Sequence, residues 1–247
     1  MERLALLAVT AHPGDELAIA GTLASNAQAG MHVALACATG NEGDSDLHCA
    51  CDRLGVAELH VLGYRNSGQH GENANAPGAL ARASACEVVR RIVHLIRTIR
   101  PQVMLTFGPD GITRHVDHVA IGDLATQAFE AGRDWQQFPP AGGPEPYAPS
   151  KLFYFGLPLG LLQLVGLPGP ATPESEIAAR VDVMPFVTLK VEAARCYRGR
   201  LERLLNTLLQ LPPAERQHLL GVEYLTLVEP QPAVDDRRDP HLFAGLP

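Results

Sequence analysis

The sequence lacks a basic excess. Lys and Arg together number 20 against 27 Asp and Glu, which leaves a formal net charge of -7. Because proteins that bind nucleic acids neutralise phosphates with Lys and Arg, this balance argues against a nucleic-acid partner. The sequence also lacks a run that could cross a bilayer, since the longest apolar stretch, residues 152–167, is broken by Pro158 and three glycines. We therefore expect no membrane span.

The five cysteines do not form a recognisable disulfide framework or zinc site. Their number is odd, Cys37 lies in an apolar strand-like run, and the Cys-Ala-Cys at residues 49–51 has no second cysteine pair nearby. We expect reduced thiols in a cytoplasmic protein. A signal-peptide pattern is missing too, because the polar residues 10–12 interrupt the first apolar run.

Strand-like apolar runs alternate with helical patterns along the chain. Strands are expected at residues 4–9, 31–38, 58–62, 103–107, 152–155, 179–183 and 222–228. Helices are expected at residues 17–30, 47–54, 79–100, 115–131 and 185–211. This alternation predicts an α/β fold with a Rossmann-like, doubly wound, mostly parallel sheet. We interpret residues 1–247 as one domain, with a core over 1–135 and C-terminal additions over 150–230.

A polar motif, Thr-Ala-His-Pro-Gly-Asp-Glu at residues 10–16, separates the first strand from the first helix. His12, Asp15 and Glu16 therefore lie at the carboxyl end of a central strand, the edge where such sheets bind ligands. A histidine and a carboxylate three residues apart on this turn can reach one metal ion. An acidic helix start with an unrelated histidine explains the same residues.

A second motif, His-Val-Asp-His at residues 115–118, follows the fourth strand. His115 and His118 are three residues apart and share one face of a helix, while Asp117 can orient a ligating imidazole. By itself this motif also fits a capped helix start with two solvated histidines. Taken together, the two motifs offer two histidines and a carboxylate, which is the pattern of a catalytic metal site with an open position.

These motifs resemble those of the LmbE-like, or PIG-L, family of zinc-dependent N-deacetylases, which act on N-acetylglucosamine attached to inositol, malate or related groups. The family motif A-H-P-D-D-E reads A-H-P-G-D-E at residues 11–16, and H-P-D-H reads H-V-D-H at residues 115–118. Further similarity lies at residues 62–68, 100–103 and 181–183. The resemblance covers residues 4–130 well and the C-terminal third more loosely.

The resemblance implies a hydrolase that removes the N-acetyl group from a small N-acylated sugar conjugate. It implies one Zn²⁺ per chain, with His12, Asp15 and His118 as ligands. It further implies that His115 stabilises the oxyanion or protonates the leaving amine, and that Asp117 tunes His115. Zinc suits this reaction because it lowers the pKa of bound water from ~15.7 toward ~7 and polarises a carbonyl.

Three positions depart from the family pattern. Gly14 stands where the family has its general-base Asp. Asn66, beside Arg65, replaces the Asp of a Tyr-Arg-Asp-Ser-Gly segment that contacts the sugar. An Arg that holds the substrate has no clear counterpart near Gly43. We expect Arg65, Asn66 and Glu42 to be the substrate-binding residues of this chain.

Loss of a general base costs ~10²–10⁴ in rate. Glu16 is the next carboxylate after the implied ligand Asp15, and we take it as a catalytic candidate beside Glu42, Asp44 and Asp110 on the edge loops. The sequence does not choose among them. The alternative is a pseudoenzyme that binds metal or sugar without turnover.

Other functional classes fit less well. A non-haem Fe(II) oxygenase uses the same donors but is typical of all-β scaffolds, and a nucleotide-binding Rossmann protein would carry Gly-x-Gly-x-x-Gly after the first strand. The apolar residues 153–167 are interpreted as core or as a subunit contact, so a homo-oligomer is among the expectations.

Overall fold

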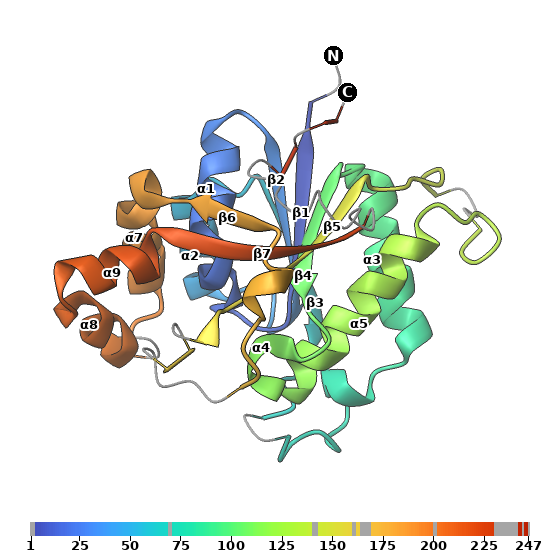
Figure 1. Ribbon diagram of the computed structural model, residues 1–247. Coiled ribbons are helices and arrows are strands. Elements are labelled where there is room, and N and C mark those ends of the chain that lie inside the picture. Colours follow the sequence, from blue (N-terminus) through green and yellow to red (C-terminus); the bar gives the residue numbers. More distant parts are fainter. Residues whose placement is uncertain are drawn as a thin grey trace.

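One sheet runs through the middle of the molecule. The computed structural model describes residues 3–68, 71–139, 143–159, 162–163, 169–199, 202–229, 242–243 and 245–246. In these ranges the strands form a sheet of order β3-β2-β1-β4-β5-β7-β6 (Figure 1). The strands are β1 (Ala5–Thr10), β2 (His32–Thr39), β3 (Glu58–Tyr64), β4 (Val103–Phe107), β5 (Lys151–Gly156), β6 (Ala179–Asp182) and β7 (Val222–Glu229).

Parallel pairing joins the first five strands, whereas β7 runs antiparallel to both β5 and β6. The expected α/β fold with a doubly wound, mostly parallel sheet is therefore confirmed. β1 and β4 are buried along their whole length, which explains why every residue in them except one threonine each is apolar. The chain leaves β1 for β2 and β3 on one side and returns to β4 on the other, so the topological switch point lies between β1 and β4.

Helices cover both faces of the sheet. α1 and α2 pack with α7, and α3 packs with α5; the two groups stand on opposite sides in Figure 1. Their bounds are α1 (Ala20–Gln28), α2 (Ser45–Leu54), α3 (Ala85–Ile99), α5 (Val116–Ala131) and α7 (Val187–Cys196). The remaining helical elements are α4 (Gly111–Arg114), α8 (Glu202–Gln210), α9 (Pro213–Leu220), η1 (Asp15–Ile19), η2 (Leu80–Arg82), η3 (Glu174–Glu176) and η4 (Met184–Phe186).

Two predicted helices differ from those in the structure. The helix predicted over 79–100 starts later, because Ala79 is extended and forms an isolated bridge with Arg65. The prediction of a single helix over 185–211 is wrong, because α7 ends at Cys196 and a separate helix, α8, begins at Glu202. Gly199 lies in this break at φ 77°, a left-handed conformation that ends a helix.

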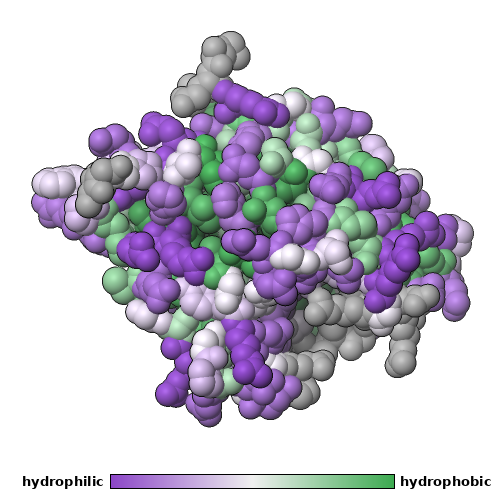
Figure 2. Space-filling view, turned by 180° about the vertical axis from the view of Figure 1, so that it is seen from behind, coloured by the Kyte–Doolittle hydropathy of each residue, from purple (hydrophilic) through white to green (hydrophobic). Residues whose placement is uncertain are grey.

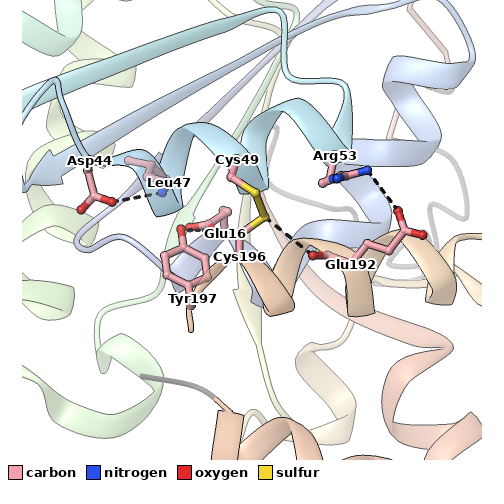
Figure 3. Close-up of a disulfide and its surroundings, with 8 residues drawn as sticks. All are labelled: Glu16, Asp44, Leu47, Cys49, Arg53, Glu192, Cys196 and Tyr197. Atoms are coloured by element: carbon pink, nitrogen blue, oxygen red, sulfur yellow. Dashed lines mark hydrogen bonds and ion pairs between the residues drawn. A yellow bond between two sulfur atoms is a disulfide. The ribbon is translucent and has the colours of Figure 1, made fainter. Parts of the chain in front are cut away.

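A disulfide joins Cys49 on α2 to Cys196 at the end of α7 (Figure 3). The expectation of five reduced thiols is wrong for this pair, whereas Cys37, Cys51 and Cys86 are free thiols. The packing of α2 on α7 brings the two Cα atoms to 5.8 Å, a separation that a disulfide can bridge. Disulfides are rare in the cytosol, so the predicted cytoplasmic location can no longer be argued from reduced thiols. The cytoplasmic location itself stays a prediction.

Among the described residues, no helix is both long enough and apolar enough to cross a membrane. The face seen in Figure 2 mixes hydrophilic and hydrophobic residues, and the hydrophobic ones gather toward its middle. In the stretch 153–167, Phe153 and Phe155 are buried in β5 and belong to the core, while residues 160–161 and 164–167 lie outside the described residues. A subunit contact by this stretch stays a prediction.

Candidate active site

The switch point carries a cluster of histidines. His12 follows β1 directly, and His115 and His118 lie at the start of α5. One ring nitrogen of each can be chosen so that all three lie within 4.8 Å of one another. The two motifs meet because β1 and β4 are paired neighbours, so the loops that follow these strands share one edge of the sheet.

Hydrogen bonds from backbone N–H groups hold the Asp15 carboxylate beside this cluster. Its Oδ2 accepts hydrogen bonds from the backbone N–H of His12 at 2.7 Å and of Ala11 at 3.1 Å. Its Oδ1 lies 3.4 Å from His118 Nε2. Burial alone would raise the pKa of Asp15, but hydrogen bonds and charges from His118 and His12 hold it well below its ordinary value. A carboxylate ion therefore faces both imidazoles.

The outer nitrogens of the two imidazoles are taken by acceptors. His12 Nε2 lies 2.9 Å from Asp117 Oδ2, and His118 Nδ1 lies 3.1 Å from the carbonyl oxygen of Gly111. Each outer nitrogen therefore carries a proton in the neutral ring, which leaves His12 Nδ1 and His118 Nε2 as lone pairs. These two atoms face each other at 3.1 Å. Two lone pairs cannot bond each other, so the position between them favours a proton or a metal cation.

The electrostatics of His12 agree with this reading. Burial by itself would lower the pKa of His12, but the hydrogen bonds and charges of Asp117 and Asp15 outweigh it and raise the pKa to about 9. The pocket thus holds one positive charge strongly. Two nitrogens and a carboxylate oxygen are donors that zinc accepts, and they leave a coordination position open.

Asp117 is held by Ser67, which the sequence interpretation missed. The Ser67 hydroxyl donates to Asp117 Oδ1 at 2.5 Å, and the Ser67 backbone N–H donates to Oδ2 at 2.8 Å. Both residues are fully buried. The signal was present, because Ser67 belongs to the segment 62–68 that resembles the family, but its contact with a residue 50 positions away is tertiary.

His115 caps the N-terminus of α5. Its Nδ1 accepts a hydrogen bond from the backbone N–H of Asp117 at 3.1 Å, so the proton of the neutral ring lies on Nε2. Burial, and then the charges of His12 and His118, lower the pKa of His115. The ring is edge-on to His12, with centroids 4.6 Å apart. A neutral His115 can therefore donate from Nε2 without carrying a charge.

Glu16 does not reach the cluster, although we predicted a catalytic role for it. It is fully buried, and its carboxylate accepts hydrogen bonds from the Tyr197 hydroxyl at 2.6 Å and from the Gly14 backbone N–H at 2.9 Å. Burial raises the pKa of Glu16 to about 7. Figure 3 shows Glu16 and Tyr197 beside the disulfide of Cys196. Glu16 therefore lacks the access to water that a general base needs. Its hydrogen bond with Tyr197 connects the segment that carries Asp15 to the end of α7.

The predicted substrate residues lie in two places. Arg65 and Asn66 are exposed and precede Ser67, and Asn66 Oδ1 accepts from the Gly68 backbone N–H at 2.7 Å. Glu42 lines a separate cavity of about 630 Å³ under β3 and α3, and the described lining of that cavity includes no member of the histidine cluster. Arg65 and Asn66 thus adjoin the site only through Ser67, which contacts Asp117, and Glu42 lines a cavity away from it.

The other candidate bases serve as helix caps. Asp44 accepts from the Leu47 backbone N–H at 3.1 Å and caps α2. Asp110 accepts from the Ile112 backbone N–H at 2.8 Å and caps α4. Among the described residues, the carboxylates in contact with the histidine cluster are those of Asp15 and Asp117.

A metal-type donor set of this kind, at the switch point of an open, mostly parallel sheet, fits a metal-dependent hydrolase built on an α/β fold. The family described as PIG-L, GlcNAc-PI de-N-acetylase, matches residues 7–129. The 1D-myo-inositol 2-acetamido-2-deoxy-alpha-D-glucopyranoside deacetylase of Salinispora arenicola is 30% identical, over 98% of this chain and 91% of the relative. This chain belongs to the PIG-L, or LmbE-like, deacetylase family, and with it to the amide hydrolases.

Solved structures share the fold. The 4-carboxy-2-hydroxymuconate hydratase GalB of Pseudomonas putida matches with a TM-score of 0.65 and 18% identity, covering 93% of this chain and 98% of that one. The N,N'-diacetylchitobiose deacetylase of Pyrococcus horikoshii matches with a TM-score of 0.65 and 17% identity, covering 92% and 84%. At such identities the likeness speaks for the fold alone, and one of the two names is that of a hydratase.

Proposed function

We propose that this protein removes the N-acetyl group from an N-acetylglucosamine-type sugar conjugate and that it holds one Zn²⁺ per chain between His12, Asp15 and His118. The observation that carries the proposal is the close approach of His12 Nδ1 and His118 Nε2, 3.1 Å apart, with Asp15 Oδ1 3.4 Å from His118 Nε2. Membership of the PIG-L family and the deacetylase names of its relatives support the reaction type.

Zinc bound there would supply an acidified water and a polarised amide carbonyl. The protein's own groups prepare the site for it. Asp117 keeps the proton of His12 on Nε2, and the Gly111 carbonyl keeps the proton of His118 on Nδ1. His115 presents its Nε2–H for a developing oxyanion or for the leaving amine.

Gly14 has no side chain, so position 14 provides no general base that could take a proton from water. The carboxylates that contact the cluster within the described part of the chain are already engaged, Asp15 by the backbone and Asp117 by Ser67 and His12. We therefore expect slow turnover, ~10²–10⁴ below that of a relative with a general base. The same observation favours the second candidate, a protein that binds metal and sugar but does not hydrolyse them.

The proposal also treats residues 1–247 as one domain. One continuous cluster of buried hydrophobic residues includes members from Leu6 in β1 to Leu225 in β7, which supports this view.

Zinc content and amine release, measured on the same samples, test the proposal. We expect about one zinc per chain and slow release of free amine from an N-acetylglucosaminyl inositol. Asp15→Asn should lose most of the zinc, whereas Asp123→Asn, on the exposed side of α5, should keep it. Zinc without amine release would favour the second candidate. Equal zinc in both variants would contradict the ligand assignment.

A further inference from the structure

The disulfide between Cys49 on α2 and Cys196 on α7 lies in the wall of a surface cavity of about 490 Å³ (Figure 3). Both cysteines line this cavity and are half-buried, so small solutes can reach the bond between their sulfur atoms. The volume falls in the range typical of sites for small molecules, ~300–1,000 Å³. The other described residues of the lining are all charged: Asp46, Arg53, Glu192, Arg195 and Arg198. The cavity therefore combines a reactive bond with charged side chains.

The lining of this cavity is positively charged, although the chain as a whole is acidic. Three arginines against two carboxylates give the lining a charge of +1, beside a formal net charge of -7 for the chain. Arg53 Nη1 lies 3.9 Å from Glu192 Oε2. Among the described residues, Arg195 and Arg198 have no ion-pair partner, and both are exposed. Because a cleft with an excess of one charge concentrates ions of the opposite sign, the cavity attracts small anions.

The free thiols of the chain are poorly suited to open this disulfide. The attacking group in thiol–disulfide exchange is a thiolate, but Cys37 and Cys51 are buried. Burial raises the pKa of the Cys51 thiol to about 12 and that of the Cys37 thiol well above its ordinary value. Cys86 is exposed on α3, which covers the opposite face of the sheet from α2 and α7 (Figure 1). A thiol that opens the disulfide therefore has to come from solution.

The two sulfur atoms differ in the charges around them. Cys196 lies between Arg195 and Arg198 in the sequence, whereas Asp46 precedes Cys49 by about one turn of α2. An anionic thiolate is therefore attracted to the Sγ atom of Cys196 and repelled from that of Cys49.

We propose that this cavity is a thiol-exchange site, at which a small thiol that also carries a carboxylate or sulfonate group opens the Cys49–Cys196 disulfide. The arginines pair with the acidic group of the small thiol. Its thiolate attacks Sγ of Cys196 and forms a mixed disulfide there, while Cys49 leaves as a thiolate and takes a proton from water. A second thiolate attacks the small thiol's sulfur in the mixed disulfide, which releases the oxidised small thiol and leaves Cys196 reduced. The two electrons come from the two small thiols.

The exchange reaches the histidine pocket through Tyr197, which follows Cys196 directly. The Tyr197 hydroxyl donates to Glu16 Oε1 at 2.6 Å, and Glu16 Oε2 accepts from the Gly14 backbone N–H at 2.9 Å. Opening the disulfide removes the covalent link beside these hydrogen bonds, so the segment that carries Asp15 opens more readily. Neither the exchange nor this loosening depends on the proposed function.

Exchange rates with two matched thiols test the site. 2-Mercaptoethanesulfonate and 2-mercaptoethanol differ in the charged group, and each rate constant is expressed per thiolate. Samples of the native protein are quenched with acid, and intact masses distinguish the disulfide, the mixed disulfide and the reduced form. We expect the sulfonate to react ~10-fold faster at low salt, although the net charge of the chain would by itself repel it. The preference should largely disappear in 1 M NaCl, where the Debye length is about 3 Å.

Arg198→Gln should remove most of the preference for the sulfonate, and Arg195→Gln is a second variant in case the first disturbs the end of α7. Arg90→Gln is the matched control, because Arg90 is exposed on α3 and does not line this cavity. The control should keep the preference. Equal rates for the two thiols, a preference that survives both variants, or a disulfide that opens only in denaturant would overturn the proposal.

Two further measurements test the attacked sulfur and the loosening. Peptide mapping of the mixed disulfide should find the sulfonate on Cys196, and an adduct on Cys49 would overturn the assignment of the attacked atom. Hydrogen exchange of residues 14–19, compared between oxidised and reduced protein, should become about two- to tenfold faster on reduction, the equivalent of one net hydrogen bond. Residues 88–96 of α3 serve as the internal reference and should not change. Equal exchange of residues 14–19 in both forms would overturn the link to the histidine pocket.

Discussion

Restoring a carboxylate at position 14 should raise the rate of amide hydrolysis. Gly14 precedes Asp15, lines the cavity that His118 also lines, and has no side chain that could take a proton. In Gly14→Asp the new carboxylate would lie next to the zinc site, where a general base contributes ~10²–10⁴ in rate. We expect a gain of this order in kcat with the zinc content unchanged.

The substitution carries a cost in stability. Gly14 has φ 105° and ψ -19°, a left-handed conformation that residues with a side chain rarely adopt. A side chain there costs roughly 1–2 kcal/mol, against a typical stability of 5–15 kcal/mol. The variant therefore stays folded, with a melting temperature lower by about 2–8 °C.

The assay follows free amine released from an N-acetylglucosaminyl inositol, at equal zinc loading. Gly14→Asn is the matched control, because it pays the same backbone cost and has nearly the same shape but cannot take a proton. Parallel measurements of the melting temperature confirm that both variants are folded. If Gly14→Asp is no faster than Gly14→Asn, the missing base at position 14 does not limit the rate and the reasoning is refuted.

Four further predictions concern the groups that hold the site. Ser67→Ala frees the carboxylate that orients His12 and should weaken zinc binding ~10–100-fold in a chelator competition; unchanged affinity would show that this contact does not position the ligand. Tyr197→Phe removes the hydroxyl that donates to Glu16 and should lower the unfolding free energy by about 1–3 kcal/mol in urea titrations, whereas no loss would mean that a water replaces it. In the zinc-free protein, the pKa of His12 is raised from 6.5 to about 9, so folding favours the protonated ring. This contributes roughly 3 kcal/mol at most to the free energy of unfolding, fully present below pH 6.5 and lost as the pH rises through 9. Denaturation curves at several pH values measure it, and a free energy of unfolding that does not change across this range would contradict it. Cys49→Ser opens a disulfide between residues 147 positions apart and should cost about 2–5 kcal/mol, while thiol titration of the unfolded, unreduced parent chain should count three thiols, not five.

The sequence by itself determined the sheet and the two motifs. The segments that form β1 and β4 are almost entirely apolar because helices cover both faces of a parallel sheet, and this composition can be read from the sequence. His12 and His118 could be placed at one edge because the carboxyl ends of parallel strands meet there. The departure at Gly14 is likewise a fact of the sequence.

Only the tertiary structure decided the surroundings of the site. The break between α7 and α8 places Tyr197 against Glu16, 181 residues away, and takes Glu16 out of the catalytic candidates. The disulfide between Cys49 and Cys196, and the apolar cavity that leucines of α8 and α9 share with Gly14, join segments far apart in the chain. The local pattern of apolar and polar residues indicates which face of a helix or strand is buried, but it does not indicate which distant element packs against that face. Partners at such separations meet only when whole layers pack, and for that reason the chemistry of the motifs could be predicted from the sequence while the shape of the pocket around them could not.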